Sequence, residues 1–121
     1  MTGIMRLSAI ERAAKIRLEA EGYAVVPMRQ CFVSRNKPVH LMALRNTTQL
    51  LYLKLKKTLR PLPDVAAVER FCLDDILILR RLFPLSPGSI SLCFEIWILR
   101  DTGSFACYEV FAEGIREVSH V

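Results

Sequence analysis

The chain has 121 residues, enough for one domain with its own hydrophobic core, and we expect residues 1–121 to form a single domain. Apolar residues make up 52% of the sequence, a high share that favours well-buried strands or an oligomeric surface. No stretch approaches the roughly 18–20 uncharged apolar residues of a membrane helix. The start of the chain also has no long apolar segment typical of a signal peptide. We therefore expect a cytoplasmic protein without membrane association.

The net charge of +5 hides an asymmetry between the two halves of the chain. Residues 1–60 hold 12 Lys and Arg and 3 Glu, a net charge of +9, whereas residues 61–121 hold 5 Arg and 9 acids, a net charge of −4. Such a distribution suggests one side that faces a polyanion and an acidic opposite side. The alternative is that the fold mixes the two halves and the field averages out.

In chain order, the first signal is a capping box. Ser8 stands at the N-cap position and Glu11 three residues later, so each side chain can satisfy a free backbone N–H group. This predicts a helix from Ala9 to about Glu21 that ends at Gly22, which suits the left-handed position after a helix. Residues 23–28 then form a first strand, which residues 30–34 extend or bend.

A β-hairpin follows in the middle of the chain. Val39–Leu44 and Leu50–Lys56 are rich in strand-forming residues, and Asn46-Thr47-Thr48 between them is typical of a turn. Side chains alternate along a strand, so Lys54 and Lys56 point to the same face.

The second half predicts a helix and two strands. Asp64 caps a long helix that reaches Phe83, and a turn at residues 86–88 leads into a strand at Ile90–Leu99. A second hairpin, closed at residues 101–104, pairs it with Phe105–Ala112, and residues 113–121 are a candidate for a short edge strand. Trp97 is expected to face Tyr108 across this hairpin. The order helix, three strands, helix, two strands predicts a mixed sheet of about five strands flanked by two helices, in the α/β or α+β range.

The cysteines indicate no metal site and no disulfide. The chain has four, Cys31, Cys72, Cys93 and Cys107. None has a partner at zinc-binding spacing. In the expected hairpin Cys93 and Cys107 are five positions out of register, which is too far for the roughly 7 Å between Cα atoms that a bridge tolerates. We therefore expect buried, reduced thiols.

These motifs together resemble the PD-(D/E)XK nuclease superfamily, most nearly its archaeal Holliday-junction-resolvase-like and restriction-endonuclease-like members. In that family a first helix supplies a Glu and ends at a Gly before a strand, like Glu11 and the run EAEGYAVV here. The first hairpin strand then starts with an Asp before apolar residues, like His40-Leu41-Met42-Ala43, and the second carries Glu-x-Lys, like Lys54-Leu55-Lys56. The resemblance covers roughly residues 8–99 and implies a restriction-endonuclease-like fold and pairing into homodimers.

The departures from the family pattern decide the expected activity. The family chemistry needs Mg²⁺, a hard cation that takes oxygen ligands from carboxylates on both strands. His40 and Lys54 occupy the matching positions here, and a protonated lysine has no lone pair for a metal. Only Lys56 and Glu11 keep the family's residue type. The resemblance thus implies a nuclease fold whose metal site has been lost, with no cofactor.

Structural explanations compete with these functional ones. The capping box already accounts for Glu11, and His40 at a strand start can be a half-exposed polar residue. Lys54 and Lys56 can protect a sheet edge from aggregation, and Trp97 and Tyr108 can be packing residues.

A rearranged active site is a further alternative, with Mg²⁺ as its cofactor. Glu69 or Asp75 on the second helix could reach the sheet edge, whereas Asp74 points away from the buried side of that helix. Glu95, on the fourth strand, is another carboxylate but has no evident partner.

Our first hypothesis is a catalytically inactive nuclease-fold protein that binds the nucleic-acid backbone. Its expected contacts are basic residues in and around the first hairpin: Arg35, Lys37, Arg45, Lys54, Lys56 and Lys57. The alternatives are a protein-interaction or structural subunit without nucleic-acid binding, and a metal-dependent nuclease with a rearranged active site.

Overall fold

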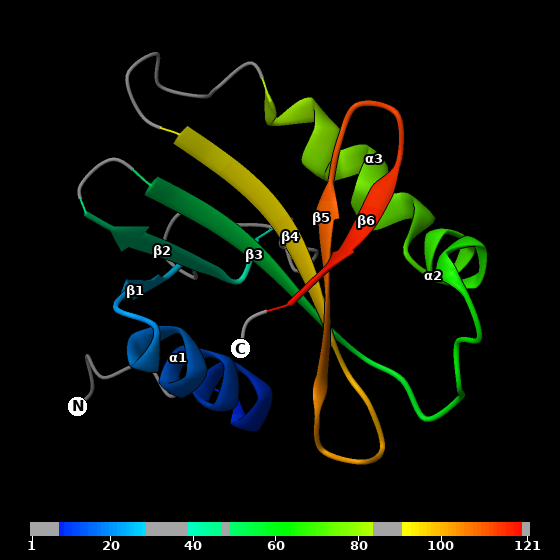
Figure 1. Cartoon of the computed structure of the whole chain (residues 1–121), viewed down its shortest axis with the longest axis horizontal. Coiled ribbons are helices and arrows are strands. Elements are labelled where there is room, and N and C mark those ends of the chain that lie inside the picture. The colour runs from blue at the N-terminus through cyan, green and yellow to red at the C-terminus, as the bar shows by residue number, and fades with distance from the viewer. Residues whose placement is uncertain (1–7, 29–38, 47–48, 84–90, 120–121) are drawn as a thin grey trace, which may run out of the picture.

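The computed structural model describes residues 8–28, 39–46, 49–83 and 91–119. Within them the chain forms three helices and six strands (Figure 1). In chain order these are α1 (Ala9–Ala20), β1 (Ala24–Pro27), β2 (Leu41–Arg45), β3 (Gln49–Lys57), α2 (Val65–Phe71), α3 (Leu73–Arg81), β4 (Ser91–Leu99), β5 (Phe105–Val110) and β6 (Ile115–Val118). None of the described helices is long and apolar enough to cross a membrane.

All six strands belong to one mixed sheet in which spatial order follows chain order, from β1 to β6. Every neighbouring pair is antiparallel except β3 and β4, which run parallel and are joined by the crossover through α2 and α3. The prediction of a mixed α/β fold is confirmed. The expected numbers are corrected from about five strands to six and from two helices to three, because β6 forms a full edge strand and the second helix is divided.

The first helix begins where the sequence predicts. The Ser8 hydroxyl accepts a hydrogen bond from the Glu11 backbone N–H, and the Glu11 carboxylate accepts one from the Ser8 N–H at 2.9 Å. This reciprocal pair is the predicted capping box. Beyond the helix, Gly22 has φ +93°, a backbone conformation that residues with a Cβ atom rarely adopt.

The second helix is not continuous from Asp64 to Phe83, as the apolar pattern predicted. Asp64 caps α2 as expected, but the helix breaks at Cys72, which has φ −107° and ψ 13°, and α3 ends at Arg81. No Pro or Gly marks this break. Its reason is tertiary, because α2 contacts β6 whereas α3 contacts β5. Cys72, fully buried at the break, lets both halves pack on the twisted sheet.

The sheet separates two hydrophobic cores. On one face, α1 packs through Ala14 and Leu18 against alternate residues of the strands, among them Leu53 and Trp97. On the other face, α2 and α3 pack through residues such as Val68 and Ile76 against the intervening residues of β4 and β5. Figure 1 shows α1 on one side of the sheet and α2 and α3 on the other. The molecule therefore has three layers, helix, sheet and helices.

The register of the β4–β5 hairpin differs from the prediction by one residue. Leu99 pairs with Phe105, so Trp97 faces Cys107, and Tyr108 faces Ile96. The backbone N–H of Arg100 donates to the Ser104 carbonyl, so Arg100 stands opposite Ser104 instead of Phe105 and the loop is closed at residues 101–103. Because a slip of one residue reverses every side chain, Trp97 and Tyr108 lie in opposite cores instead of facing each other.

The predicted absence of a disulfide between Cys93 and Cys107 is confirmed, since both are free thiols, as is Cys72. Burial raises the pKa of Cys107 to about 12, and smaller contributions come from the nearby charges of Arg17, Glu95, Glu21 and Arg100. The Cys31 thiol lies outside the described residues.

Candidate functional site

Strand β3 presents two lysines to the face covered by α3. Residues 50–56 alternate in direction, so Leu53 and Leu55 enter the α1-side core while Lys54 and Lys56 point the opposite way. Their strand partners in β4 are Ile96 and Ile98, which belong to the α3-side core. The prediction that both lysines share one face is thus confirmed.

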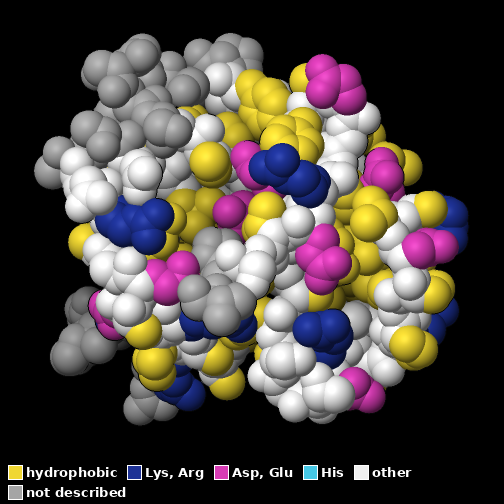
Figure 2. Space-filling view, viewed as in Figure 1, with side chains coloured by type: hydrophobic (Ala, Val, Ile, Leu, Met, Phe, Trp, Pro, Cys, Tyr) yellow, Lys and Arg dark blue, Asp and Glu magenta, His cyan; other side chains and the backbone are white. Residues whose placement is uncertain are grey.

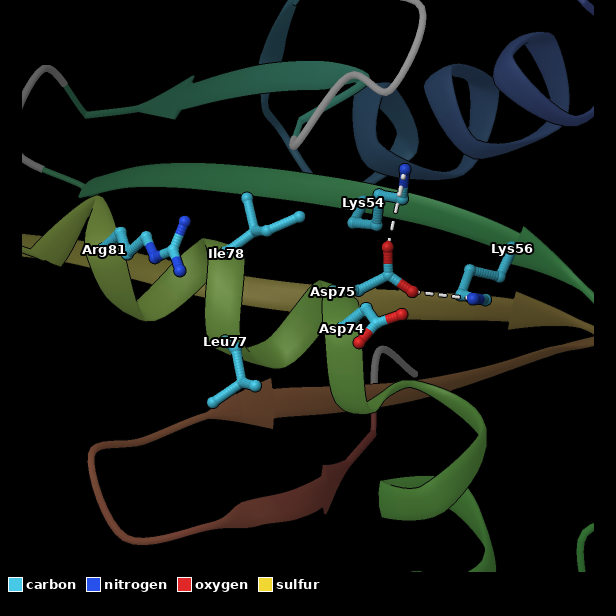
Figure 3. Close-up of a pocket in the computed structure, with 7 residues that line it drawn as sticks. All are labelled: Lys54, Lys56, Asp74, Asp75, Leu77, Ile78 and Arg81. Atoms are coloured by element: carbon cyan, nitrogen blue, oxygen red, sulfur yellow. Dashed lines mark hydrogen bonds and ion pairs between the residues drawn. The ribbon is translucent and has the colours of Figure 1, made fainter.

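Asp75 of α3 lies between the two lysine side chains (Figure 3). The Lys56 Nζ donates to Asp75 Oδ2 at 2.6 Å, and the Lys54 Nζ lies 3.7 Å from Asp75 Oδ1. All three side chains are mostly buried, with exposed fractions of 14% for Lys54, 24% for Lys56 and 16% for Asp75. Partial burial weakens screening by water and salt, so this triad is stronger than an ordinary surface ion pair.

The triad forms one wall of an open cavity of about 510 Å³ between β3 and α3. The described residues that line it are Lys54, Lys56, Asp74, Asp75, Leu77, Ile78 and Arg81. Three of these side chains are cationic and two anionic, which leaves a net charge of +1. Figure 3 shows Arg81 at the far end of α3 from the triad, with Ile78 between them.

Two neighbours fix the surroundings of Lys56. Its Nζ lies 4.7 Å from the centre of the Phe71 ring, a cation–π distance, at the end of α2. Cys72 follows immediately, and burial raises the pKa of its thiol to about 11, with smaller opposing effects from Lys56 and Asp75. A thiol that stays protonated is a poor nucleophile, so Cys72 does not supply covalent chemistry here.

His40 has a structural role at the start of β2. Its backbone N–H donates to the Leu53 carbonyl at 2.8 Å, and its ring Nδ1 accepts a hydrogen bond from the Leu55 N–H at 2.9 Å. The imidazole therefore completes the backbone pairing where β2 begins. An Nδ1 atom that accepts this bond carries no proton and has no lone pair left for a metal.

Glu11 is buried, with 3% exposed, and caps α1 on the other side of the sheet. It is not among the described residues that line the cavity. The structure thus brings together Lys54 and Lys56, but not Glu11, from the positions that match the nuclease motif.

The other predicted basic residues lie elsewhere. Arg45, at the end of β2, stacks on the Tyr23 ring at 4.5 Å and donates to the Gln49 side chain at 2.9 Å. Lys57 is exposed at the last position of β3, while Arg35 and Lys37 lie outside the described residues. In the view of Figure 2, acidic and apolar groups separate the described Lys and Arg side chains, which form no continuous basic surface there.

The carboxylates considered for a rearranged site are distributed over both faces. Asp75 reaches Lys54 and Lys56, as the alternative requires, and exposed Asp74 also lines the cavity despite the expectation that it points away. Glu69, in α2, is not among the described lining residues. Glu95 lies on the α1 side, where it accepts a hydrogen bond from the Trp97 Nε1 at 2.9 Å.

Sequence reasoning missed Arg81 as a site residue. Its signal was present, since Asp74, Ile78 and Arg81 follow the i, i+4, i+7 spacing of one helix side. The pattern becomes visible as part of a site only when α3 is placed beside β3.

Cationic side chains outnumber acidic ones in the lining of this cavity, three against two. Ammonium and guanidinium groups donate hydrogen bonds but cannot ligate a metal. Among the described residues, no group of three or more His, Cys, Asp or Glu side chains could hold a metal ion. A scan against models of known protein families found no match, and a search of curated proteins found no significant match.

Proposed function

We propose that this protein is a nuclease-fold domain that binds the phosphate backbone of nucleic acids without cleaving it. The observation that carries the proposal is the convergence of Lys54 and Lys56 on one open cavity, with Arg81 at its other end. Phosphate groups take hydrogen bonds and charge from such side chains without any information about base sequence.

Lys56 retains donors for such a ligand. A lysine ammonium has three N–H groups, and Asp75 accepts one of those of Lys56. The ion pair and the Phe71 ring also hold this side chain in one position, so less conformational entropy is lost when a phosphate binds.

The order of the elements and the residues of the β2–β3 hairpin support the proposal. The order of α1, three antiparallel strands, a helical crossover and parallel β4 is compatible with the order expected from the sequence. His40, Lys54 and Lys56 come from the same β2–β3 hairpin. At the positions of the family's metal-binding acids this chain has Lys54 and His40, and the His40 ring is hydrogen-bonded to the backbone of β3. Without those acids we expect phosphate binding and no metal-assisted hydrolysis.

The test is a fluorescence anisotropy titration with labelled duplex, branched and single-stranded DNA across a salt series. Binding should be insensitive to base sequence and should weaken steeply with salt, because phosphate contacts release counterions. Lys54→Gln/Lys56→Gln should weaken binding at low salt about tenfold or more and reduce the log–log salt slope by roughly one unit per lost contact. These neutral substitutions avoid placing a new negative charge beside Asp75.

The matched control is Arg12→Gln/Lys15→Gln, which removes the same charge from exposed or half-exposed positions of α1. Equal losses in both double variants would attribute binding to net charge and contradict the assignment to this cavity. No binding to any DNA form at low salt would overturn the proposal and favour the protein-interaction or structural subunit. Urea unfolding of each variant separates lost binding from lost folding.

A rearranged nuclease remains a second candidate because Asp75 lies beside Lys56, the residue that would stabilise charge on a phosphate. Nicking of supercoiled DNA that needs Mg²⁺, stops with EDTA and is lost in Asp75→Asn would favour it over simple binding. The homodimer also stays a prediction, which light scattering after gel filtration measures directly.

A further inference from the structure

A second cavity lies where the two parallel strands end. β3 ends at Lys57 and β4 at Leu99. Residues that follow the two strands line a cavity of about 280 Å³: Thr58, Arg60, Pro61 and Leu62 after β3, and Arg100 and Asp101 after β4. The carboxyl ends of parallel strands are the place where open α/β sheets most often bind small ligands. This site is separate from the Lys54–Lys56 cavity and requires nothing of the proposed nucleic-acid binding.

The wall after β3 is held by local hydrogen bonds. The Thr58 hydroxyl accepts a bond from the Arg60 N–H at 3.1 Å and donates to the Arg60 carbonyl at 3.0 Å, while the Thr58 N–H donates to the Leu99 carbonyl. Pro61 follows and has a fixed φ angle. The backbone that carries Arg60 is thus defined before any ligand binds.

The floor of the cavity is apolar and belongs to the α3-side core. Ile98 and Ala106 are buried strand residues, and Leu62 folds over them from the loop. Apolar surface of this kind favours a ligand with a hydrocarbon or aromatic body. The small volume limits that body to about the size of a single ring.

Tyr108 places one polar group in this apolar floor. Its side chain lines the cavity, and the residue is only 8% exposed. Its hydroxyl is not one of the buried side-chain atoms left without a partner, so it meets the open space of the cavity and can donate to a ligand there. Burial, the largest effect, raises the pKa of Tyr108, and Glu117 adds to it while Arg100 opposes it, so the hydroxyl stays protonated near neutral pH and can donate.

The rim is mainly cationic. The exposed side chains of Arg60 and Arg100 lie at the mouth with one acid, Asp101. Guanidinium groups match the planar geometry of a carboxylate and form charge-assisted hydrogen bonds with it.

We propose that this cavity binds a small organic carboxylate with an apolar body. The carboxylate lies between Arg60 and Arg100, one of its oxygens accepts a hydrogen bond from the Tyr108 hydroxyl, and the body packs on Leu62, Ile98 and Ala106. The class of ligand follows from this combination, since a neutral ligand leaves the arginines unused and a bare inorganic anion leaves the floor uncovered.

The test is a titration of the ¹⁵N-labelled full chain with phenylacetate, followed by amide chemical shifts, with neutral phenylacetamide as the matched ligand. Phenylacetate should give saturable shifts at residues 58–60, 62 and 100–101, with a Kd of about 1 mM or tighter. Phenylacetamide should bind at least about fivefold more weakly, because it loses the charge-assisted bonds.

Three variants locate the contacts. Arg60→Gln and Arg100→Gln should each raise the Kd for phenylacetate about fivefold, and Tyr108→Phe about threefold, whereas the control Arg12→Gln on α1 should not change it. Unchanged amide dispersion shows that each variant is folded. The proposal is overturned if phenylacetate gives no saturable shifts, if the amide binds equally well, or if the shifts centre on the Lys54–Lys56 cavity.

Discussion

The two faces of β3 differ in how completely a helix covers them. On the α1 side, Leu53 is fully buried and belongs to a continuous apolar core with Leu18 and Trp97. On the α3 side, the neighbouring residues Lys54 and Lys56 keep part of their surface exposed and pair with Asp75. Adjacent residues of one strand therefore have different surroundings, since those on the α1 side enter an apolar core and those on the α3 side form ion pairs at a partly exposed cavity.

The difference shows where a binding site can arise without loss of the core. Because Asp75 of α3 lies over the strand and pairs with both lysines, their charges are accommodated at partial burial. In the proposed function, a phosphate would replace part of the Asp75 contact at a site that is already polar.

The largest expected effect on stability comes from a substitution on the α1 face of β3. Leu53→Ala should lower the free energy of unfolding by about 2–5 kcal/mol, the range for deleting a buried leucine and leaving a cavity. Lys54→Ala, one residue away, should cost less than about 1 kcal/mol because Asp75 keeps its bond to Lys56. Urea denaturation measures both, and similar losses would show that the two faces are energetically equivalent.

The buried thiols provide a second comparison, with Cys107 on the α1 side and Cys72 on the α3 side. Burial raises both pKa values above the ordinary 9.0, to about 12 and about 11 respectively. The unfolded chain therefore loses these protons first, so the stability they contribute is complete below pH 9 and decreases as pH rises towards the folded pKa values.

The free energy of unfolding should fall above pH 9 by up to about 1.4 kcal/mol per pH unit for each thiol. Urea denaturation between pH 7.5 and 10.5 tests this against the double variant Cys72→Ala/Cys107→Ala, whose dependence on pH should be shallower. An identical slope in both proteins would mean that the thiols do not govern alkaline stability.

On the α3 face, Asp75→Asn tests how the carboxylate between the two lysines affects DNA affinity. Removing the carboxylate frees the charge of the two lysines, and affinity for duplex DNA at low salt should rise by up to about tenfold, with a smaller gain at high salt. Asp74→Asn is the matched control, because it removes the same charge from an exposed neighbour with no ion pair among the described residues. Weaker binding of Asp75→Asn would instead show that the carboxylate holds the lysines in place.

The smallest effect concerns Glu11, which the nuclease resemblance connects with the catalytic acids. Glu11→Ala removes half of the capping box and should lower stability by about 1 kcal/mol, a typical cost for a lost cap. DNA affinity measured by anisotropy should not change. A loss of affinity without a loss of stability would place Glu11 in the binding site.

Local patterns were sufficient where the signal itself is local. The capping box at Ser8 and Glu11 set the start of α1, and strict alternation in β3 placed Lys54 and Lys56 on one face. Asp64 likewise capped α2 as expected. Each of these features depends on residues within one or two turns or one strand, so the sequence contains all the information that they require.

Other features were decided by packing over longer distances. The apolar spacing of residues 64–83 cannot show a break at Cys72, which arises because α2 and α3 meet different strands. A shift of one residue in the pairing of β4 with β5 moved Tyr108 from the Trp97 side to the opposite core.

Local sequence patterns were enough to locate most of the helices and strands, their apolar sides and the shared face of Lys54 and Lys56. Only the tertiary structure decided which helix lies over those lysines, that Asp75 and Arg81 join them, and that Tyr108 enters a cavity with Arg60 and Arg100. The physical reason is that periodicity reports which side of an element is apolar, whereas a site also depends on which elements the packed core brings side by side.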